Sequence, residues 1–317
     1  MDRDFAHVVV IGAGPAGVAA AVQLARYGIR PVVFERDIVG GLLRTAWFVE
    51  NYPGFPRGIC GRELAELMAE HLRGSGAELM GHEVASVVMD GNGLLVRWDG
   101  GEMQAGSVLV ASGTRPRVPD EPELPAEAAG HVHYESRELW GRHGASIAII
   151  GGGDAAFDYA IGLSESNRVT IFIRGSEARC LQVLSSRLGR METADVRTYT
   201  SVTAVRALPD GRLELSIAGP EAGQGVRSVA GAAVNRSHET FDHLLFAIGR
   251  VPADSFLDRE VLERSAELAS ANRLLYAGDV RSGAFRQASI ASGLGTLAAM
   301  RIAAGIRPGD GLTTERS

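Results

Sequence analysis

The apolar residues of the chain cluster in short runs that end at glycines. Residues 8–11, all Val or Ile, predict a buried parallel strand, and the glycine-rich stretch 12–17 that follows predicts a tight turn. An alanine-rich helix then extends to Gly28, a residue type that commonly ends helices. A second strand is predicted over 31–34 and ends at Glu35. The N-terminal region therefore predicts a unit of strand, turn, helix and strand.

The same unit recurs in the middle of the chain. Residues 146–150 predict a strand, residues 151–156 a glycine turn, and a helix to about Glu165 and a strand over 169–173 follow. A lone glycine turn can occur by chance in a chain with 40 glycines, but two copies in register predict an α/β fold with two Rossmann-like dinucleotide-binding domains. Aligned without gaps, the copies place Gly12 opposite Gly151, Gly17 opposite Ala156, Gly28 opposite Asn167 and Glu35 opposite Arg174.

Two further similar segments mark the predicted connections between the domains. Residues 108–113 and 244–249 are each an apolar run that ends in glycine, and a proline follows soon after each. If the chain crosses between domains at both places, the second domain is an insertion in the first. The prediction is therefore a split FAD-binding domain of residues 1–117 and 245–317, with an NAD(P)H-binding domain of residues 118–244 inserted in it.

The glycines of both turns suit the binding of a dinucleotide. In such turns they permit a tight bend, a close approach of the pyrophosphate and close packing of the helix, whose N-terminus faces the phosphates. A side chain in their place would fill the phosphate site. The candidate phosphate-binding residues are Gly12, Gly14, Pro15, Ala16 and Gly17 in the first unit, and Gly152, Gly153, Asp154 and Ala155 in the second.

The acidic Glu35 and the basic Arg174 occupy equivalent positions and predict different nucleotides. A carboxylate there accepts hydrogen bonds from an adenosine ribose but repels a 2′-phosphate, whereas a guanidinium accommodates that phosphate. The first unit is therefore predicted to bind FAD and the second NADPH, with Arg179 as a further ligand of the phosphate. The alternative for Arg174 is a solvated residue at the end of a strand.

Composition and charge narrow the classes of function. The 317 residues are 45% hydrophobic and can bury a sizeable core, and the net charge of −6 has no basic block that would favour nucleic acid or an anionic membrane. All 32 basic residues are arginine, so chemistry that needs a lysine imine is excluded. With only two cysteines, Cys60 and Cys180, and no apolar run long enough to span a membrane, a cytoplasmic location is expected.

Two segments near the C-terminus could complete a flavin site. Gly278 and Asp279 follow an apolar strand, and the aspartate is placed to accept a hydrogen bond from a ribityl hydroxyl. Arg286, Gln287 and Ala288 begin a predicted helix, whose N-terminus could stabilise negative charge on a reduced flavin. A Gly-Asp pair alone more commonly marks a plain turn, so this prediction depends on the two dinucleotide units.

Together these motifs resemble the low-molecular-weight thioredoxin reductases and, in part, the thioredoxin-reductase-like ferredoxin/flavodoxin NADP reductases. The similarity covers nearly the whole chain and includes both glycine turns, both C-terminal segments, Gly40–Leu43, Glu50–Gly54, Ala111–Gly113 and Ala247–Gly249. The resemblance implies a homodimer, FAD held by the first unit and the C-terminal segments, flavin contacts from around Thr45 and Asn51, and an adenine contact near Val84. Further candidate cofactor contacts in these segments and beside them are Arg36, Gly41, Leu42, Ala111, Gly113, Ile248 and Gly249.

The chain departs from thioredoxin reductases at their redox motif. That family carries Cys-x-x-Cys-Asp just before the second glycine turn, where a gapless count places residues 134–138, Tyr-Glu-Ser-Arg-Glu. No dithiol is present there, and only the final acid survives in type. Glu138 is therefore the candidate for a catalytic general acid, and its alternative role is to cap or solvate the next segment. His131 and His133 are spaced like metal ligands but lack a third ligand, so no metal is predicted.

Three functions are open on this basis. The leading one is an FAD-dependent oxidoreductase that takes electrons from NADPH and passes them to an external acceptor, either a ferredoxin- or flavodoxin-type protein or a small molecule. The second is a thiol/disulfide oxidoreductase that acts directly at the flavin, with Cys60 as a redox thiol instead of a small buried residue. The third is a non-catalytic sensor that keeps both nucleotide sites.

Overall fold

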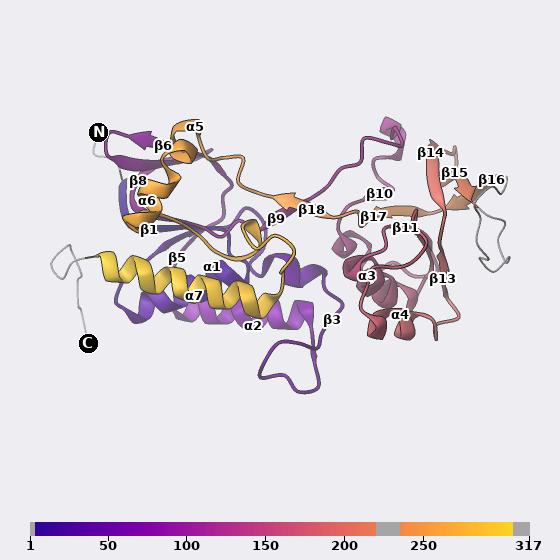
Figure 1. Ribbon diagram of the computed structural model, residues 1–317, viewed down its shortest axis with the longest axis horizontal. Coiled ribbons are helices and arrows are strands. Elements are labelled where there is room, and N and C mark those ends of the chain that lie inside the picture. Colours follow the sequence, from indigo (N-terminus) through magenta and orange to yellow (C-terminus); the bar gives the residue numbers. More distant parts are fainter. Residues whose placement is uncertain (1–3, 220–234, 307–317) are drawn as a thin grey trace. The chain divides into compact units, whose positions relative to one another are not determined.

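The computed structural model of the protein describes residues 4–219 and 235–306, and the chain divides into two units (Figure 1). Each unit has its own sheet and its own buried core. Unit 1 consists of residues 1–44, 48–115 and 251–317, and unit 2 consists of residues 45–47 and 116–250.

The main sheet of unit 1 is built around the strand that precedes the first glycine turn. Its strands are β1 (Asp4–Ile11), β2 (Val32–Phe34), β5 (Glu78–Met80), β6 (Val84–Asp90), β7 (Gly93–Trp98), β8 (Gly101–Val110) and β19 (Leu274–Tyr276). β1 pairs in parallel with β2 on one side and β8 on the other, and β5 pairs in parallel with β2. The other edge of β8 pairs with β7 over its first half and with β19 over its second. β6 and β7 form an antiparallel hairpin.

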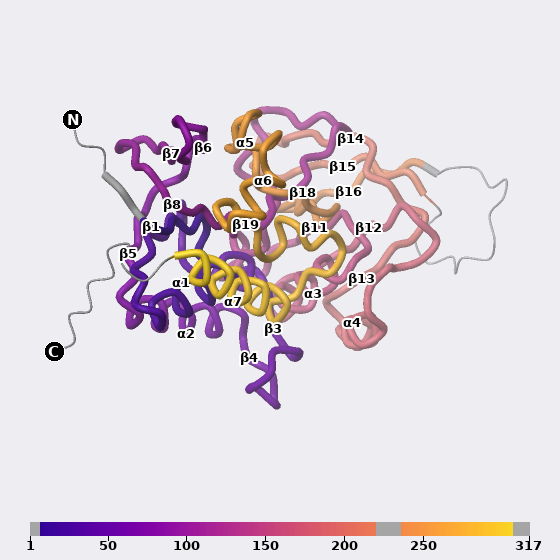
Figure 2. The backbone as a smooth tube through the Cα atoms, turned by 60° about the vertical axis from the view of Figure 1, so that its left-hand side comes forward, coloured from indigo at the N-terminus to yellow at the C-terminus, as the bar shows by residue number. Residues whose placement is uncertain are grey.

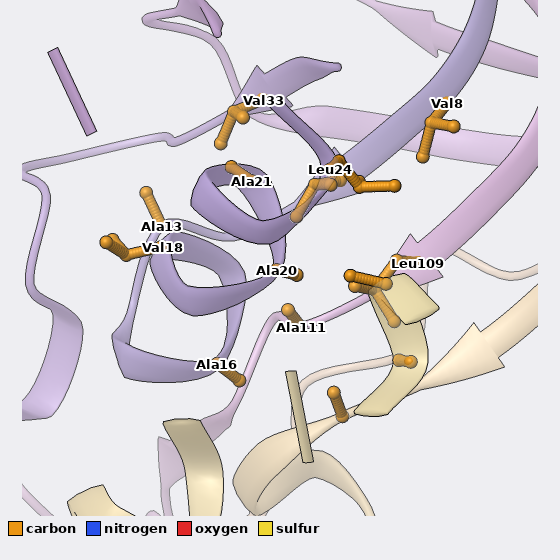
Figure 3. Packing of buried hydrophobic residues seen from close by; sticks show 14 of the residues in the cluster. Val8, Ala13, Ala16, Val18, Ala20, Ala21, Leu24, Val33, Leu109 and Ala111 are labelled. Carbon is orange, nitrogen blue, oxygen red and sulfur yellow. The ribbon is translucent and has the colours of Figure 1, made fainter. Parts of the chain in front are cut away.

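Three helices cover this sheet, and two of them are rich in alanine or glycine. α1 (Pro15–Arg26), α2 (Gly61–Gly74) and α7 (Ala288–Gly305) lie side by side in both views (Figures 1 and 2). Figure 3 shows the alanines of α1 against Val8, Val33 and Leu109 of the sheet. A Cβ at Gly295 of α7 would stand 2.0 Å from the carbonyl oxygen of Ala16, so α1 and α7 pack at a separation that only glycine permits.

Shorter elements complete unit 1. They are the 3₁₀ turns η1 (Gly41–Thr45, whose last residue falls in unit 2) and η4 (Gly278–Val280), the helices α5 (Arg259–Glu263) and α6 (Ser265–Ser270), and the antiparallel pair β3 (Phe48–Val49) and β4 (Ile59–Cys60). Within residues 4–219 and 235–306, no helix combines the length and the apolarity that crossing a bilayer requires.

Unit 2 repeats the parallel arrangement in a five-stranded sheet. Its strands are β10 (Val132–His133), β11 (Ser146–Ile150), β12 (Arg168–Phe172), β13 (Ala194–Arg197) and β17 (His243–Phe246), in the order β10-β17-β11-β12-β13. Ile147, Ile149, Phe157 and Ile171 form its buried core together with α3 (Asp154–Ser164). The remaining elements are α4 (Gln182–Leu188), η2 (Ala126–Ala128), η3 (Ser136–Leu139) and an antiparallel sheet of β14 (Ser201–Ala207), β15 (Leu213–Gly219) and β16 (Asn235–Phe241).

Two short strands carry the chain between the units. β9 (Thr114–Pro116) and β18 (Arg250–Pro252) pair with each other. The second boundary therefore lies at Arg250, whereas the sequence predicted it at 244. The difference arises because β17 pairs with β10 and β11, Ala247 donates its N–H to the carbonyl oxygen of Ile150, and Arg250 forms an ion pair with Glu135, all within unit 2. Residues 307–317 of the last predicted segment lie outside the described residues.

Candidate nucleotide and redox sites

The first and last glycines of the turn after β1 are required by the fold itself. Gly12 has φ +100, and a Cβ on it would stand 2.5 Å from the carbonyl oxygen of Ala111. A Cβ on Gly17 would stand 1.8 Å from the carbonyl oxygen of Gly12. Both neighbours are backbone atoms that cannot turn aside, so these two glycines set the tight bend and the close approach of α1 to the turn.

The middle glycine of the same turn faces open space. The nearest atom to a Cβ on Gly14 is the Cα of Gly41, at 4.0 Å, and Gly14 has an extended backbone that any residue can adopt. Gly14 precedes the first turn of α1, where the helix N–H groups have no intrahelical acceptor and the dipole favours an anion. The protein's own packing therefore does not require glycine here, whereas a bound pyrophosphate would.

Glu35 is held against this turn at the end of β2. Its Oε2 accepts a hydrogen bond from the N–H of Ala13 at 2.8 Å, and its Oε1 accepts one from the N–H of Asp37 at 3.0 Å. These bonds orient the carboxylate beside the glycines, as an acceptor for a ribose requires. The neighbouring Arg36 was predicted to contact the cofactor. In the structure its guanidinium forms an exposed ion pair with Glu83 at 2.8 Å.

The C-terminal segments also meet the first turn. Gly278, with φ +77, lies so close to α1 that its Cβ would stand 2.8 Å from the Cβ of Ala16. In unit 1, Ser112 Oγ and Arg286 Nε are buried without a hydrogen-bond partner among the described residues. Buried polar atoms are usually satisfied, so atoms left open here suit a bound cofactor. The donors, acceptors and open space of unit 1 thus fit FAD.

The other predicted flavin contacts lie on several elements of unit 1. Gly41 and Leu42 lie in η1, where Gly41 faces Gly14, and Val84 begins β6 in the core that includes Phe34. The remaining contacts lie after β8 (Ala111 and Gly113), between β3 and β4 (the exposed Asn51), in η4 (Asp279) and at the start of α7 (Gln287 and Ala288). Thr45 is the exception, because it groups with unit 2, where its carbonyl accepts a hydrogen bond from Ser136 Oγ at 2.9 Å.

The second glycine turn repeats this geometry. A Cβ on Gly151 would stand 2.3 Å from the carbonyl oxygen of Ala247, the residue that follows β17 as Ala111 follows β8, and Ile248 and Gly249 come next. A Cβ on Gly152 would meet Ile173 Cγ2 at 3.1 Å, whereas a Cβ on Gly153 would have no atom within 4 Å. Gly153 therefore leaves open space before α3 in the way that Gly14 does before α1.

Two exposed arginines lie beside the second turn. Arg174 follows β12, and the backbone of Arg179 bridges to Gly153 and donates its N–H to the carbonyl oxygen of Gly152 at 2.6 Å. Neither guanidinium forms an ion pair within the part of the chain that the structure describes. Two free cations beside an open helix N-terminus, where Ala155 and Asp154 form the first turn, fit the 2′-phosphate and pyrophosphate of NADPH.

The segment that replaces the redox motif is tied into unit 2. The ring of Tyr134 stacks on Phe246 with centroids 5.6 Å apart, and burial raises the pKa of Tyr134. Glu135 forms an ion pair with Arg250 at 2.9 Å, and both side chains are mostly buried. Tyr134, Glu135 and Ser136 thus each have a structural partner among the described residues.

Glu138 belongs to a histidine cluster that the sequence revealed only in part. Its carboxylate lies 2.8 Å from Nδ1 of His133, whose Nε2 lies 3.2 Å from Nδ1 of His243. The ring of His131 stacks on His243 at 5.5 Å. The spacing of His131 and His133 was visible, but His243 joins them only because β10 pairs with β17. The described residues hold no group of three ligands arranged for a metal ion, and the role of Glu138 as an acid stays a prediction.

The histidine cluster predicts that acid destabilises unit 2. Burial, reinforced by His133 and Arg142, lowers the pKa of His243 to about 4 from 6.5. The unfolded chain therefore takes up a proton below pH 6.5 that the folded chain takes up only near pH 4. We expect the free energy of unfolding to fall by up to about 3 kcal/mol across that interval. Urea unfolding between pH 7 and 4 measures this fall.

Two substitutions control this measurement. His243→Gln removes the titrating group and should flatten the dependence on pH, whereas His7→Gln in unit 1 should leave it unchanged. Equal pH dependence in the wild type and His243→Gln would contradict the assignment.

The comparisons with known proteins agree with this geometry. The chain matches the pyridine nucleotide-disulphide oxidoreductase family over residues 6–295 and belongs to it. It is 34% identical over 311 residues to the bifunctional thioredoxin reductase/thioredoxin of Mycobacterium leprae; the match covers 93% of this chain and 64% of that protein. It is 32% identical over 300 residues to the thioredoxin reductase of Mycolicibacterium smegmatis, covering 92% and 94%. The structure of Lactococcus lactis thioredoxin reductase superposes with a TM-score of 0.79, at 25% identity, over 95% of this chain and 98% of that one.

This membership confirms several predictions from the sequence. The resemblance to thioredoxin reductases and the fold class are confirmed, and the thioredoxin reductases use FAD and NADPH. The chain spans less than two thirds, 64%, of the length of the bifunctional relative. The individual site residues, the acceptor and the assembly stay proposals.

Proposed function

We propose that the protein is an FAD-dependent oxidoreductase that takes electrons from NADPH and passes them to an external acceptor without a disulfide of its own. The observation that carries this proposal is the repeated open position in its two glycine turns. Gly14 and Gly153 are glycines that the protein's own packing does not demand, each placed at the start of a helix beside a strand end. Two such positions in one chain support two bound dinucleotides.

In unit 1 the chain's residues would bind and orient the flavin nucleotide. The first turn of α1 would hold its pyrophosphate, Glu35 would accept hydrogen bonds from its ribose, and Asp279 would accept one from the ribityl chain. The N-terminus of α7, at Ala288, would stabilise negative charge on the ring. When bound, FAD supplies the two-electron chemistry that links NADPH to an acceptor.

The acceptor is the part of the proposal where this chain departs from its relatives. The names of the mycobacterial relatives point to thioredoxin as their partner. Residues 134–138 of this chain contain no cysteine, and Tyr134, Glu135 and Ser136 are engaged within unit 2. We therefore propose a ferredoxin- or flavodoxin-type protein or a small molecule as the acceptor.

Anaerobic stopped-flow spectroscopy tests this function. The protein as isolated should carry about one FAD per chain, and NADPH should bleach it. Ferredoxin, flavodoxin, a quinone, oxygen and a low-molecular-weight disulfide are then offered to the reduced protein in turn. Gly153→Val is the matched control: its side chain enters open space, so it should keep the FAD but block reduction by NADPH.

Each outcome of that experiment discriminates between functions. Reoxidation by a non-thiol acceptor supports the proposal. Flavin that NADPH cannot bleach would make the protein a binding module or sensor, and reoxidation by the disulfide alone would make it a thiol-linked enzyme.

Arg174 should determine the preference for NADPH over NADH. Its guanidinium follows β12 at the position equivalent to Glu35 and has no ion pair among the described residues. Losing a charge-assisted contact of about 1.5–3 kcal/mol in Arg174→Ala should weaken NADPH binding roughly ten- to a hundredfold. NADH binding should change little. Rates of flavin reduction at varied nucleotide concentration measure both; an unchanged ratio would refute the role, and Arg168→Ala at the opposite end of β12 is the control.

We also propose that the protein is a cytoplasmic homodimer. Ile290, Leu294, Leu297 and Met300 are spaced to share one side of α7, and they are 37–56% exposed. An exposed apolar stripe on a surface helix commonly marks a site that a partner protein covers. A second copy of this chain fits the homodimer that the family resemblance implies.

A further inference from the structure

An acidic residue stands where the second glycine turn should bind phosphate. Asp154 is the first residue of α3 and directly follows the open position at Gly153. A carboxylate adds no favourable charge to a phosphate site, so its presence needs another reason. Its Oδ1 accepts a hydrogen bond from the backbone N–H of Leu181 at 2.8 Å. Asp154 therefore ties the segment that precedes α4 to the start of α3.

A second contact ties the same segment to the turn. The N–H of Arg179 donates to the carbonyl oxygen of Gly152 at 2.6 Å, and the backbone of Arg179 bridges to Gly153. Arg179 thus lies two residues before the point that Asp154 holds. The segment leading to it, 175–177, is exposed, and at its start the carbonyl oxygen of Gly175 accepts the N–H of Tyr199. Ala178 and Cys180 on either side of Arg179 pack against the core of unit 2, and the two ties add to this packing in holding the backbone of Arg179 beside the turn.

We infer that Asp154 is a positioning residue for the selection of NADPH. By holding Leu181, it keeps Arg179 against the glycine turn, where the guanidinium can meet the 2′-phosphate. The inference rests on the proposed function, because it assumes that unit 2 binds NADPH. What Asp154 contributes is an acceptor oxygen and not its charge. An asparagine offers an equivalent acceptor oxygen without the charge, whereas an alanine offers none.

Binding of two small probes by calorimetry tests this inference without flavin reduction. Adenosine 2′,5′-bisphosphate carries the 2′-phosphate, and ADP lacks it. Loss of one exposed hydrogen bond in Asp154→Ala should weaken the bisphosphate about three- to tenfold and change ADP less than about twofold. Asp154→Asn should recover most of that loss. Arg179→Ala should weaken the bisphosphate at least as much as Asp154→Ala.

The double variant decides whether Asp154 acts through Arg179. In the Arg179→Ala background, Asp154→Ala should have no further effect beyond about twofold, because the group that it positions is gone. Additive losses, equal losses of both probes, or an Asp154→Asn as weak as Asp154→Ala would each overturn the inference. If the wild type binds neither probe, the proposed nucleotide site itself fails. If the wild type selects the bisphosphate and Asp154→Ala does so equally well, only this inference fails.

Discussion

Replacing Gly14 by valine should give a folded but colourless protein. The new side chain would enter the open space before α1, where the nearest atom is the Cα of Gly41, and the extended backbone at Gly14 accepts a β-branched residue. The same space is where the pyrophosphate of FAD would approach the helix N-terminus. Several charge-assisted hydrogen bonds would be lost together, so we expect FAD affinity to fall by at least about a hundredfold. Absorbance at the flavin maximum and thermal melting measure the two effects.

Gly17→Val is the matched control within the same motif. Its Cβ would overlap the carbonyl oxygen of Gly12, and the two nearest atoms are backbone atoms that cannot turn aside, so the folded state should lose about 3 kcal/mol or more. The two valines are thus expected to separate flavin binding from folding. If Gly14→Val kept its FAD, the site would not be where we place it. If Gly14→Val melted as early as Gly17→Val, that glycine would serve the fold and not the cofactor.

The two nucleotide-binding units could be predicted from the sequence because their signal is local. A run such as 8–11 followed at once by glycines encodes strand, turn and helix within about 30 residues. The charge difference between Glu35 and Arg174 is equally local, since each follows the second strand of its unit. The structure adds which glycines serve the fold, because that depends on the distant Ala111 and Ala247.

What the sequence left open depends on contacts between distant segments. His243 joins His133 only through the pairing of β10 with β17, which lie far apart in the chain. The same pairing explains why unit 2 extends beyond the predicted residue 244, to Arg250. The motif G-G-G-D indicated a phosphate site but could not show that Asp154 holds Leu181. Periodicity and spacing carry no information on such partners.

The absence of a dithiol leads to the other large expected effect: no turnover of thioredoxin through an internal disulfide. A relay of that kind needs two adjacent sulfurs, one to meet the flavin and one to exchange with the partner. Cys60 and Cys180 belong to different units, and both are free. Burial raises the pKa of Cys180, and the negative charge of the nearby Asp154 carboxylate raises it further. Little of the Cys180 thiol is therefore present as the reactive thiolate at neutral pH.

We therefore expect the double variant Cys60→Ser/Cys180→Ser to keep its FAD, its reduction by NADPH and its delivery of electrons to a non-thiol acceptor. Thioredoxin reduction should be below detection in both the wild type and the variant, with the Mycolicibacterium smegmatis relative as the positive control. The single variants Cys60→Ser and Cys180→Ser show whether either thiol acts alone. Loss of all acceptor reduction in the double variant at normal FAD content would make a cysteine part of the mechanism. The function of a thiol/disulfide oxidoreductase that acts directly at the flavin would then replace the function proposed for this protein.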